Sequence, residues 1–293
     1  MTIKKGSKGE LVKIVQNFLG ILSDGDFGRK TEIAVMKFQM DNGLMADGVV
    51  GNNTWKLMQV ASTDMQEKSV ALPSGLVIHP AYMDKGEYSS KTSKKEYLFI
   101  HHTAGWNNPK NVIKDWNDDN RGMIGTEFVI GGQNIKTGDD EWDGEIYQAF
   151  PEGHYAWHLG KIGKQSVHTD SVGIELCNFG QLDNGKTWSG AVANINQIEK
   201  LDFPFRGFNE YHKYSDDQIK ALEKLILHVA DRDNIDVRDG LPRLIKKNGG
   251  KAFEFNEDAY YGRIKGLWTH TNTRKDKFDC SPQENLVYML FKL

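Results

Sequence analysis

Two adjacent histidines at the end of a short apolar run are the first candidates for chemistry in this sequence. Residues 97–100 read Tyr-Leu-Phe-Ile, an aromatic and β-branched pattern that predicts a buried strand. His101 and His102 follow it directly. A buried strand holds the residues at its end rigidly, so imidazoles at this position are suited to bind a metal or to act as a base. The alternative for either ring is a packed core histidine.

A third histidine ends another short apolar run near the carboxyl terminus. His270 follows Leu-Trp-Thr at 267–269, and Lys277, Asp279 and Cys280 come soon after it. A hydrolytic zinc site needs three protein ligands and one open position for water. Two strand-end histidines with one carboxylate or thiolate satisfy this requirement, although ligands so far apart in the chain make spacing a weak signal. The sequence contains no His-Glu-x-x-His, which argues against the commonest metalloprotease arrangement.

A single carboxylate inside an apolar run is the next candidate. Residues 172–176 read Val-Gly-Ile-Glu-Leu, so Glu175 interrupts a predicted buried strand. A carboxylate in such surroundings is costly unless it is paired or functional. Glu175 is therefore a candidate general base, and a structural glutamate paired with a nearby Arg or Lys is the alternative.

These candidates lie in a segment where predicted strands and helices alternate over about 200 residues. Ser-Asp-Asp-Gln at 215–218 is a capping box that opens an amphipathic helix through about Ala230. Such alternation favours an α/β domain with a mixed central β-sheet flanked by helices, which we place at residues 94–293. Further strands are expected at 126–130, 144–150 and 172–176.

Composition excludes several other classes of protein. The 293 residues suggest about two domains, and 39% hydrophobic with 26% charged residues describe a globular protein with a substantial core. A net charge of −3 without a long basic run gives no reason to expect nucleic acid as a partner. No stretch approaches the ~18 apolar residues of a membrane span, and the first residues do not read as an export signal. Cys177 and Cys280 alone do not indicate a disulfide framework.

The amino-terminal region contains an internal repeat. Asp-Gly-Asp-Phe-Gly-Arg-Lys-Thr at 24–31 recurs 23 positions later as Asp-Gly-Val-Val-Gly-Asn-Asn-Thr at 47–54. Each copy is a glycine-containing turn that leads into a helix, and amphipathic stripes flank the first copy. The sequence predicts a small three-helix domain at 1–62, joined to the α/β domain by a polar linker at 63–93. Within that linker, the segment Leu76 to Tyr82 is a candidate edge element of the second domain.

This repeat resembles the peptidoglycan-binding module found at the ends of many cell-wall hydrolases. The match covers 6–55 and rests on Asp-Gly-x-Phe-Gly-x-x-Thr, Ala-Val-x-x-Phe-Gln and Gly-Leu-x-x-Asp-Gly-x-Val-Gly-x-x-Thr-Trp. The resemblance implies a non-catalytic targeting domain that binds bacterial peptidoglycan. Its glycan-facing groove is expected between Asp47 and Trp55, which are the wall-binding candidates.

The α/β segment resembles the zinc-dependent N-acetylmuramoyl-L-alanine amidases, a family that also includes the animal peptidoglycan recognition proteins. The similarity spans about Tyr97 to Pro282. It rests on His-His-Thr-Ala at 101–104, Ala-Trp-His-Leu-Gly at 156–160, Ser-Val-Gly-Ile-Glu-Leu at 171–176 and the stretch 270–282. Two inserts, 180–214 and 236–261, are unmatched, and the sequence does not indicate their role.

The resemblance implies a Zn²⁺ site. The first histidine of the pair is a ligand in this family, so His101 and His270 are the expected ligands, whereas strand alternation turns His102 away. The third ligand in the family is Asp or Cys. The distance from the catalytic lysine position favours Asp279, and the softer sulfur ligand would favour Cys280. We expect Asp279 and keep Cys280 as the alternative.

The resemblance also implies the remaining roles. Glu175 stands where the recycling amidases of the family place their general base, and the tyrosine that some relatives use instead would fall at Thr126. Lys277 would stabilise the tetrahedral oxyanion, with a solvated loop lysine as the alternative. The candidates for contacts with substrate are His102, Thr126, Trp157 and His158.

Together the two resemblances imply a phage endolysin that cleaves the amide bond between N-acetylmuramic acid and L-alanine. The alternatives are a wall-binding protein with a decayed site, a cellular wall-remodelling or recycling amidase, and a peptidase that acts within the stem peptide. As an endolysin, the chain is expected to be a monomer without an export signal. It would remain in the host cytoplasm until a partner holin opens the membrane, and would then act on the wall.

Overall fold

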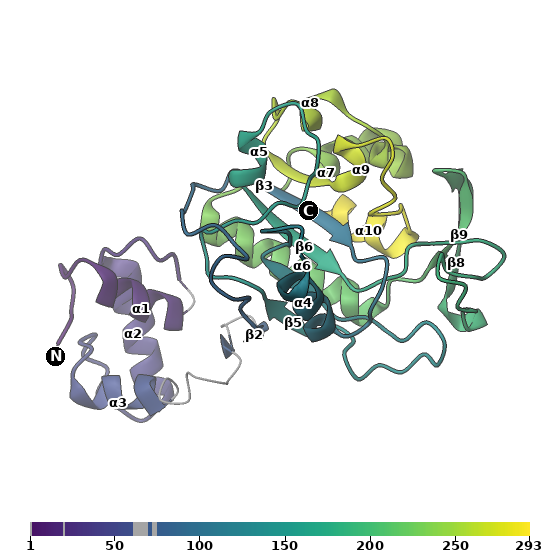
Figure 1. Ribbon diagram of the computed structural model, residues 1–293. Coiled ribbons are helices and arrows are strands. Elements are labelled where there is room, and N and C mark those ends of the chain that lie inside the picture. Colours follow the sequence, from purple (N-terminus) through teal and green to yellow (C-terminus); the bar gives the residue numbers. More distant parts are fainter. Residues whose placement is uncertain (1, 20, 61–69, 72–74) are drawn as a thin grey trace. The chain divides into compact units, whose positions relative to one another are not determined.

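The computed structural model describes residues 2–19, 21–60, 70–71 and 75–293. The chain divides into two compact units, Met1–Val77 and Ile78–Leu293 (Figure 1). Within the predicted linker, residues 63–69 and 72–74 lie outside the described residues, and 70–71 form the short strand β1 (Val70–Ala71). No helix in the described ranges is long and apolar enough to cross a bilayer.

The first unit is helical, as predicted. It contains α1 (Glu10–Phe18), α2 (Arg29–Asp41) and α3 (Asn52–Val60). Isolated bridges join Ile3 to Val50 and Lys8 to Asp26, which ties the amino-terminal residues to both turns. The apolar sides of the helices and turns enclose a core of Val12, Val15, Phe27, Val35, Val50 and Met58.

The sequence repeat is also a structural repeat, because a buried glutamine closes each turn. Gln16 bonds to three groups of the first copy: Asp24 Oδ1 at 2.6 Å, Gly25 N at 2.8 Å and Thr31 Oγ1 at 3.1 Å. Gln39 bonds to the same groups of the second copy: Asp47 Oδ1 at 2.8 Å, Gly48 N at 2.9 Å and Thr54 Oγ1 at 3.1 Å. The Asp, Gly and Thr of the repeated motif therefore hold the turns in shape.

Replacing Gln39 with leucine should loosen the second turn. The leucine leaves the Gly48 N–H without its acceptor in buried surroundings, and an unsatisfied buried polar group costs about 1–3 kcal/mol. Hydrogen exchange of the Gly48 amide in the full chain is expected to quicken about tenfold or more. Lys37→Leu, at an exposed position of α2, is the control. Equal exchange in Gln39→Leu and the wild type would mean that this glutamine does not hold the turn.

The second unit is built on a mixed central sheet, which confirms the predicted α/β class. The antiparallel pair is β4 with β5, and the neighbouring pairs β2–β5, β4–β6, β6–β3 and β3–β10 are parallel. The predicted strands of this sheet all form. They lie in the order β2 (Val77–Pro80), β5 (Ile146–Gln148), β4 (Phe128–Ile130), β6 (Ser171–Leu176), β3 (Tyr97–His102) and β10 (Gly266–Thr269).

Helices cover both faces of this sheet (Figure 1). Val129 packs with the buried apolar residues of α4 (Pro109–Asp118), whereas its neighbour Phe128 lies under the Arg232 guanidinium of α6 (Asp216–Asp233). Successive residues of a strand face opposite sides, so α4 and α6 cover opposite faces. The other helices of this unit are α5 (Ser166–Thr169), α7 (Leu241–Asn248), α8 (Glu257–Tyr260), α9 (His270–Thr273) and α10 (Glu284–Lys292).

The second unit begins earlier than the sequence predicts. The linker is expected to run to residue 93, but the segment from Ile78 onward belongs to the compact unit. β2 pairs with β5, and the segment continues along the sheet edge. Its backbone N–H groups donate to distant carbonyl groups: Ala81 to Gln148, Met83 to Ala149 and Ser89 to Tyr155. The polar composition of the segment concealed this backbone pairing.

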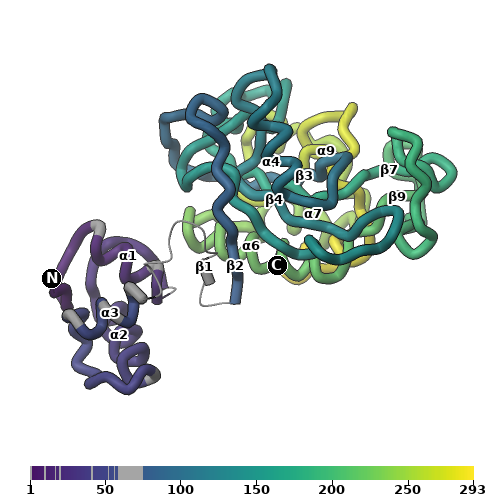
Figure 2. The backbone as a smooth tube through the Cα atoms, turned by 60° about the horizontal axis from the view of Figure 1, so that its bottom comes forward, coloured from purple at the N-terminus to yellow at the C-terminus, as the bar shows by residue number. Residues whose placement is uncertain are grey.

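Both inserts are folded. Residues 180–214 form an antiparallel sheet in the order β7 (Gln181–Leu182), β9 (Phe208–His212) and β8 (Ile198–Phe205). Figure 1 shows β8 and β9 beyond the carboxyl-terminal ends of β3 and β6, and Figure 2 shows β7 and β9 at the same end of the unit. Residues 236–261 contain α7, a 3₁₀ helix (Gly249–Phe253) and α8.

Candidate metal centre

Three side chains that are far apart in the sequence meet in one buried cluster. His101 Nδ1 lies 3.2 Å from His270 Nδ1 and 3.1 Å from Asp279 Oδ2, and the last two atoms are 3.0 Å apart. The residues are 3%, 5% and 9% exposed, respectively. Two imidazole nitrogens and a carboxylate oxygen grouped in this way form a donor set suited to a divalent metal ion.

The sheet register brings the two histidines together. β3 and β10 are adjacent parallel strands, with Ile100 beside Thr269. His101 and His270 therefore follow at the same level of the sheet. His270 is also the first residue of α9, and a capping box at Thr269 fixes the start of that helix. Both histidines therefore lie at the ends of strands, as the sequence predicts.

Hydrogen bonds at the other ring nitrogens leave both Nδ1 atoms available. His270 Nε2 lies 3.1 Å from the Leu159 carbonyl oxygen, which only accepts. His101 Nε2 lies 2.8 Å from His158 Nδ1, and His158 Nε2 lies 2.8 Å from Ser171 Oγ. Ser171 Oγ donates to a backbone carbonyl in turn. The assignment consistent with these partners places the proton of each ring on Nε2, so the two Nδ1 lone pairs face the cluster.

The surroundings favour the protonation states that metal binding needs. Burial lowers the pKa of His101 to about 4 and that of His158 well below its usual value, so both rings are neutral at neutral pH. Burial by itself would raise the pKa of Asp279, but the adjacent His270 and His101 hold it well below its usual range. Neutral imidazole and ionised carboxylate are the forms that bind metals.

Glu175 lies beside this cluster with a carboxylate oxygen that has no partner. In the parallel pairing of β3 with β6, Glu175 is next to His101, so the two side chains share a face of the sheet. Its Oε2 is buried and has no hydrogen-bond partner among the described residues. Burial and then the charge of Asp279 raise the pKa of Glu175 well above its usual value, while Lys277 acts to lower it. A buried carboxylate in this condition is a candidate for chemistry.

Lys277 supplies a positive charge near the cluster. It is half-buried in the loop that leads to Asp279, and its Nζ has no hydrogen bond or ion pair with another described residue. The charge acts on both Glu175 and His101, where it favours the ionised carboxylate and the neutral imidazole. The ammonium group is therefore close to the cluster and not neutralised by the described side chains.

The two candidates for the third ligand lie in different surroundings. Asp279 Oδ2 joins the two histidines, whereas the thiol of the neighbouring Cys280 is not part of the cluster. Cys280 is fully buried beside Tyr214, and burial raises the pKa of its thiol well above the usual value. A thiol in this environment stays protonated and is a poor metal ligand. The geometry favours Asp279.

The four substrate-contact candidates lie in different surroundings. Trp157 is 39% exposed, so its ring is accessible. His158 is the ring that fixes His101, which makes it a support for the cluster. The other two are buried and bonded within the protein: His102 Nδ1 lies 2.9 Å from Tyr214 Oη on the opposite face of the sheet, and Thr126 Oγ1 donates to Phe128 O at 2.9 Å.

Close packing of Thr126 and His158 explains why position 173, within β6, is a glycine. A Cβ atom at Gly173 would lie 2.6 Å from Thr126 Cγ2 and 3.2 Å from His158 Nδ1. Sequence reasoning missed Gly173 and Ser171 as supports of the site. For Gly173 a signal was available, because a glycine inside a predicted strand often marks the close approach of a neighbouring group.

An arginine of the 180–214 insert holds the loop between two cluster residues. Arg206 lies in the turn between β8 and β9, and its guanidinium donates to Lys275 O at 2.6 Å and Thr271 O at 3.1 Å. Thr271 N in turn donates to Asp279 O at 3.0 Å. The insert therefore braces the backbone that carries Asp279. Arg206 also forms an ion pair with Glu254, with 3.3 Å between Nη2 and Oε2. Nothing in the sequence pattern indicated the bracing role, because the braced groups are main-chain carbonyls.

Arg206→Lys is expected to weaken metal binding by about tenfold. A single ammonium group does not reproduce the planar fork that bonds two carbonyls, and losing a group that supports metal ligands typically costs 10–100-fold in affinity. Competition with a chromophoric chelator measures the affinity. Arg243→Lys, at an exposed ion pair with Asp239, is the matched control. Equal affinities for both variants would contradict the bracing role.

Asp47 and Trp55 of the first unit also differ in surroundings. Asp47 lines a hollow of about 230 Å³ together with Met45, Asn53 and Thr54. Trp55 packs against the helical core and is not a lining residue of that hollow. The hollow lies at the second copy of the repeat, within the region where the groove is expected.

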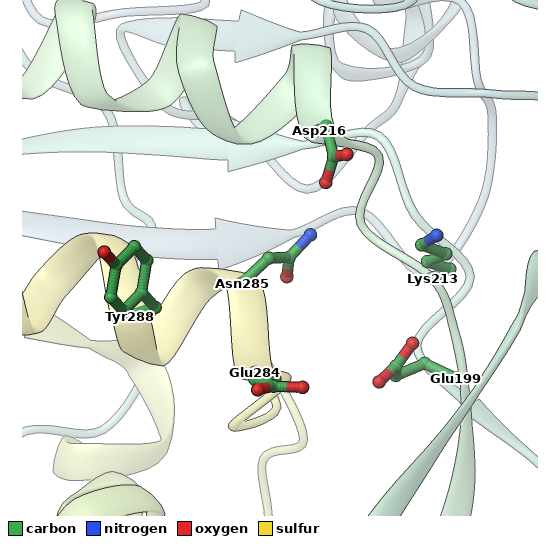
Figure 3. A pocket seen from close by; sticks show the side chains of 6 residues that line it. All are labelled: Glu199, Lys213, Asp216, Glu284, Asn285 and Tyr288. Atoms are coloured by element: carbon green, nitrogen blue, oxygen red, sulfur yellow. The ribbon is translucent and has the colours of Figure 1, made fainter.

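A larger hollow in the second unit contains none of the predicted site residues. Its volume is about 450 Å³, and it lies where α6 and α10 begin (Figure 3). Three carboxylates and one ammonium group face it, and the metal cluster is not part of its lining. The lining residues are Glu199, Lys213, Asp216, Glu284, Asn285 and Tyr288.

Comparison with known proteins assigns both parts of the chain. Residues 91–275 match the family described as N-acetylmuramoyl-L-alanine amidase, and residues 8–58 match the putative peptidoglycan binding domain. An uncharacterized protein in the bpoA1 3′ region of Kitasatospora aureofaciens is 37% identical over 68 residues, which is 21% of this chain and 58% of that protein. The chain thus spans just over half the length of this curated relative.

The chain has a distant likeness to several solved structures. PlyL is 12% identical with a TM-score of 0.39, over 68% of this chain and 84% of its own. The N-acetylmuramoyl-L-alanine amidase LysC from Clostridium intestinale is 15% identical with a TM-score of 0.36, over 73% of this chain and 95% of its own. The amidase family profile covers well over half of the present sequence. The chain therefore belongs to the N-acetylmuramoyl-L-alanine amidase family.

Proposed function

We propose that this chain is a zinc-dependent amidase that hydrolyses the bond between the lactyl group of N-acetylmuramic acid and L-alanine in bacterial peptidoglycan. The observation that carries the proposal is the buried cluster of His101, His270 and Asp279, with Glu175 beside it. The two histidines and Glu175 lie inside the segment 91–275 that matches the amidase family, and Asp279 follows shortly after its end. The match of residues 8–58 to a peptidoglycan binding domain supports the same substrate.

The donor set of the cluster fits Zn²⁺. Two imidazole nitrogens and one carboxylate oxygen are typical ligands of a catalytic zinc, which keeps a further position open. Calcium and magnesium prefer oxygen ligands, so the two histidines argue against them. A Zn²⁺ ion bound by His101, His270 and Asp279 would supply Lewis acidity toward the scissile carbonyl and toward water.

Glu175 and Lys277 carry the proton and charge steps of the proposed reaction. The unpaired Oε2 of Glu175 takes a proton from the attacking water as the new C–O bond forms at the lactyl carbonyl. Protonated Glu175 then gives that proton to the nitrogen of L-alanine as the C–N bond breaks. Lys277 supports the negative charge that develops on the carbonyl oxygen. The products are a lactyl carboxylate and a free amino terminus.

We propose that the first unit targets the chain to the wall through the hollow beside Asp47. Met45 and Asn53 line this hollow without taking part in the turn network of Gln39, so they test the groove without unfolding the turn. Met45→Ala and Asn53→Ala are expected to reduce co-sedimentation with purified walls. Unchanged sedimentation of both variants would exclude the hollow as the binding groove.

The pairing of an amidase segment with a wall-binding segment leads us to propose the role of a phage endolysin, acting as a monomer. That role would keep the chain in the host cytoplasm until a partner holin opens the membrane. Expression inside the host is then expected to cause lysis only when a holin or another membrane-permeabilising agent is supplied. Lysis without either would contradict this part of the proposal.

Product analysis tests the cleaved bond. Purified peptidoglycan treated with the protein is expected to lose turbidity and to release stem peptides with a new amino-terminal L-alanine, leaving glycan strands with free lactyl carboxylates. Mass spectrometry identifies both products. New amino termini at other residues of the stem would show a peptidase, and the absence of any new amine would show a binding protein.

A further inference from the structure

A tryptophan of the 180–214 insert is held in place although most of its ring is in water. Trp188 is 71% exposed, yet its indole Nε1 donates to Ala104 O at 2.7 Å. Ala104 belongs to the loop that directly follows His101 and His102. Burial does not explain the position of this ring, because an indole fixed by one hydrogen bond and left exposed adds little to the core.

The backbone around Trp188 is well determined by local bonds. Thr187 is buried, its N–H donates to Ala191 O at 2.9 Å, and its hydroxyl accepts from Ala191 N at 3.0 Å. Gly190 N donates to Thr187 O at 2.9 Å. The tight loop therefore presents the indole in a fixed orientation. A preorganised aromatic face of this kind is typical of a binding surface.

A second exposed indole lies on the same loop that Trp188 contacts. Trp106 is 51% exposed, and its Nε1 donates to Asp115 Oδ2 at 2.6 Å. Both indoles have their polar N–H group occupied by the protein and their ring faces in water. Trp106 stands in the loop that follows β3, and Trp188 bonds to the same loop, so both lie at the end of β3 that carries the metal cluster. The insert projects beyond the sheet at this end (Figures 1 and 2). Ligands of open α/β sheets bind at this edge.

We propose that Trp188 and Trp106 form a stacking platform for pyranose rings of the glycan strand, next to the muramoyl residue whose amide is cleaved. This inference rests on the proposed amidase function. The C–H face of a neutral sugar ring is apolar and carries partial positive charge, which suits the negative face of an indole. The indole N–H groups are already satisfied, so recognition by their faces tolerates any N-acetylated hexose of the strand. The insert thereby extends substrate binding from the stem peptide to the polymer.

The first test compares two substrates. One is a soluble glycan strand of several disaccharide units with stem peptides, and the other is a single N-acetylmuramoyl-peptide without flanking sugars. Trp188→Leu is expected to lower the ratio of polymer to monomer kcat/KM by about tenfold, through KM. Trp188→Phe, which keeps a flat ring, should recover most of this ratio. Tyr288→Ala, at an equally exposed aromatic residue on α10, should leave it unchanged.

An unchanged ratio in Trp188→Leu would overturn the platform, and so would an equal loss on both substrates, which would indicate a structural role.

A second readout is independent of catalysis. In ¹⁵N-tryptophan-labelled protein, the indole resonances of Trp188 and Trp106 are expected to shift on titration with N-acetylglucosamine oligomers, whereas that of the buried Trp268 should not. Shifts without hydrolysis of either substrate would refute the amidase and keep the platform. No shift of Trp188 would refute the platform even in an active amidase.

Discussion

Asp279→Ala is expected to remove the bound metal and to abolish peptidoglycan hydrolysis. The carboxylate supplies one of three grouped donor atoms, so its loss leaves two imidazoles to hold the ion. Removing a group that merely orients a metal ligand already costs 10–100-fold in affinity, so the loss of a ligand itself should cost more than about 100-fold. Elemental analysis of purified protein and turbidity loss of purified walls measure the two effects.

Cys280→Ala is the matched control for this prediction. The thiol is the neighbouring residue in the chain and the alternative ligand by chemistry, but it is buried beside Tyr214 and apart from the cluster. The variant is expected to keep its metal and its activity. Metal loss in Cys280→Ala together with retention in Asp279→Ala would contradict the ligand assignment and move the third ligand by one residue.

Glu175→Gln is expected to keep the metal and to lose turnover by about 10²–10⁴-fold. Glutamine preserves the shape of the side chain. Position 175 does not supply one of the grouped donor atoms, so metal binding should be retained. The amide of glutamine cannot take the proton from water and pass it to the leaving amine, and a positioned acid–base group contributes this much to the rate. Single-turnover rates on a muramoyl-peptide, beside metal content, measure both.

Glu127→Gln separates a catalytic carboxylate from a structural one. Glu127 is also buried at the central sheet, but its oxygens are bonded to Arg232 at 2.6 and 3.0 Å. Disrupting a buried ion pair costs about 3–5 kcal/mol when one charge is left unpaired, and less here because Arg232 keeps its ion pair with Asp233. This variant should therefore have a lower melting temperature and a wild-type rate when folded. A wild-type rate in Glu175→Gln would show that the general base lies elsewhere.

The sequence predicted the parts of the site that depend on strand ends. His101 and His270 each follow a short apolar run, and the parallel register of β3 and β10 brings such ends together. Glu175 was predicted for a similar reason, because a lone carboxylate in an apolar strand is unusual. Each of these signals lies within one short segment of the sequence. They hold in the folded protein because the carboxyl-terminal ends of the parallel strands lie side by side.

The residues that hold the ligands in place could not be predicted from local sequence patterns. His158 bonds to both His101 and Ser171, so its role depends on side chains that only the folded sheet brings together. Asp279 and Cys280 are adjacent, and only the loop conformation decides which of them faces the histidines. The segment Leu76 to Tyr82 was a candidate edge element, and β2 forms there. The rest of the predicted linker, to residue 93, also belongs to the second unit, because backbone pairing with distant segments leaves no trace in side-chain composition.

The hairpin in the 180–214 insert was predictable from the sequence, although it was not predicted. Arg206-Gly207 separates two runs with alternating apolar residues, which is the pattern of a hairpin, and the structure forms β8 and β9 there. What the hairpin does was not readable, because Arg206 acts on backbone carbonyl groups of a loop far along the chain. The insert is thus a brace for the cluster as well as the carrier of Trp188.

The most direct measurement of the central claim is hydrolysis of a defined muramoyl-peptide before and after removal of metal. The protein is stripped with a chelator, assayed, and titrated with Zn²⁺ while free L-alanyl amino termini are counted. The stripped protein is expected to show no cleavage and to recover fully at one ion per chain, whereas the stripped Asp279→Ala variant should fail to recover. Cleavage at the original rate by fully stripped protein would contradict a metal-dependent amidase at His101, His270 and Asp279.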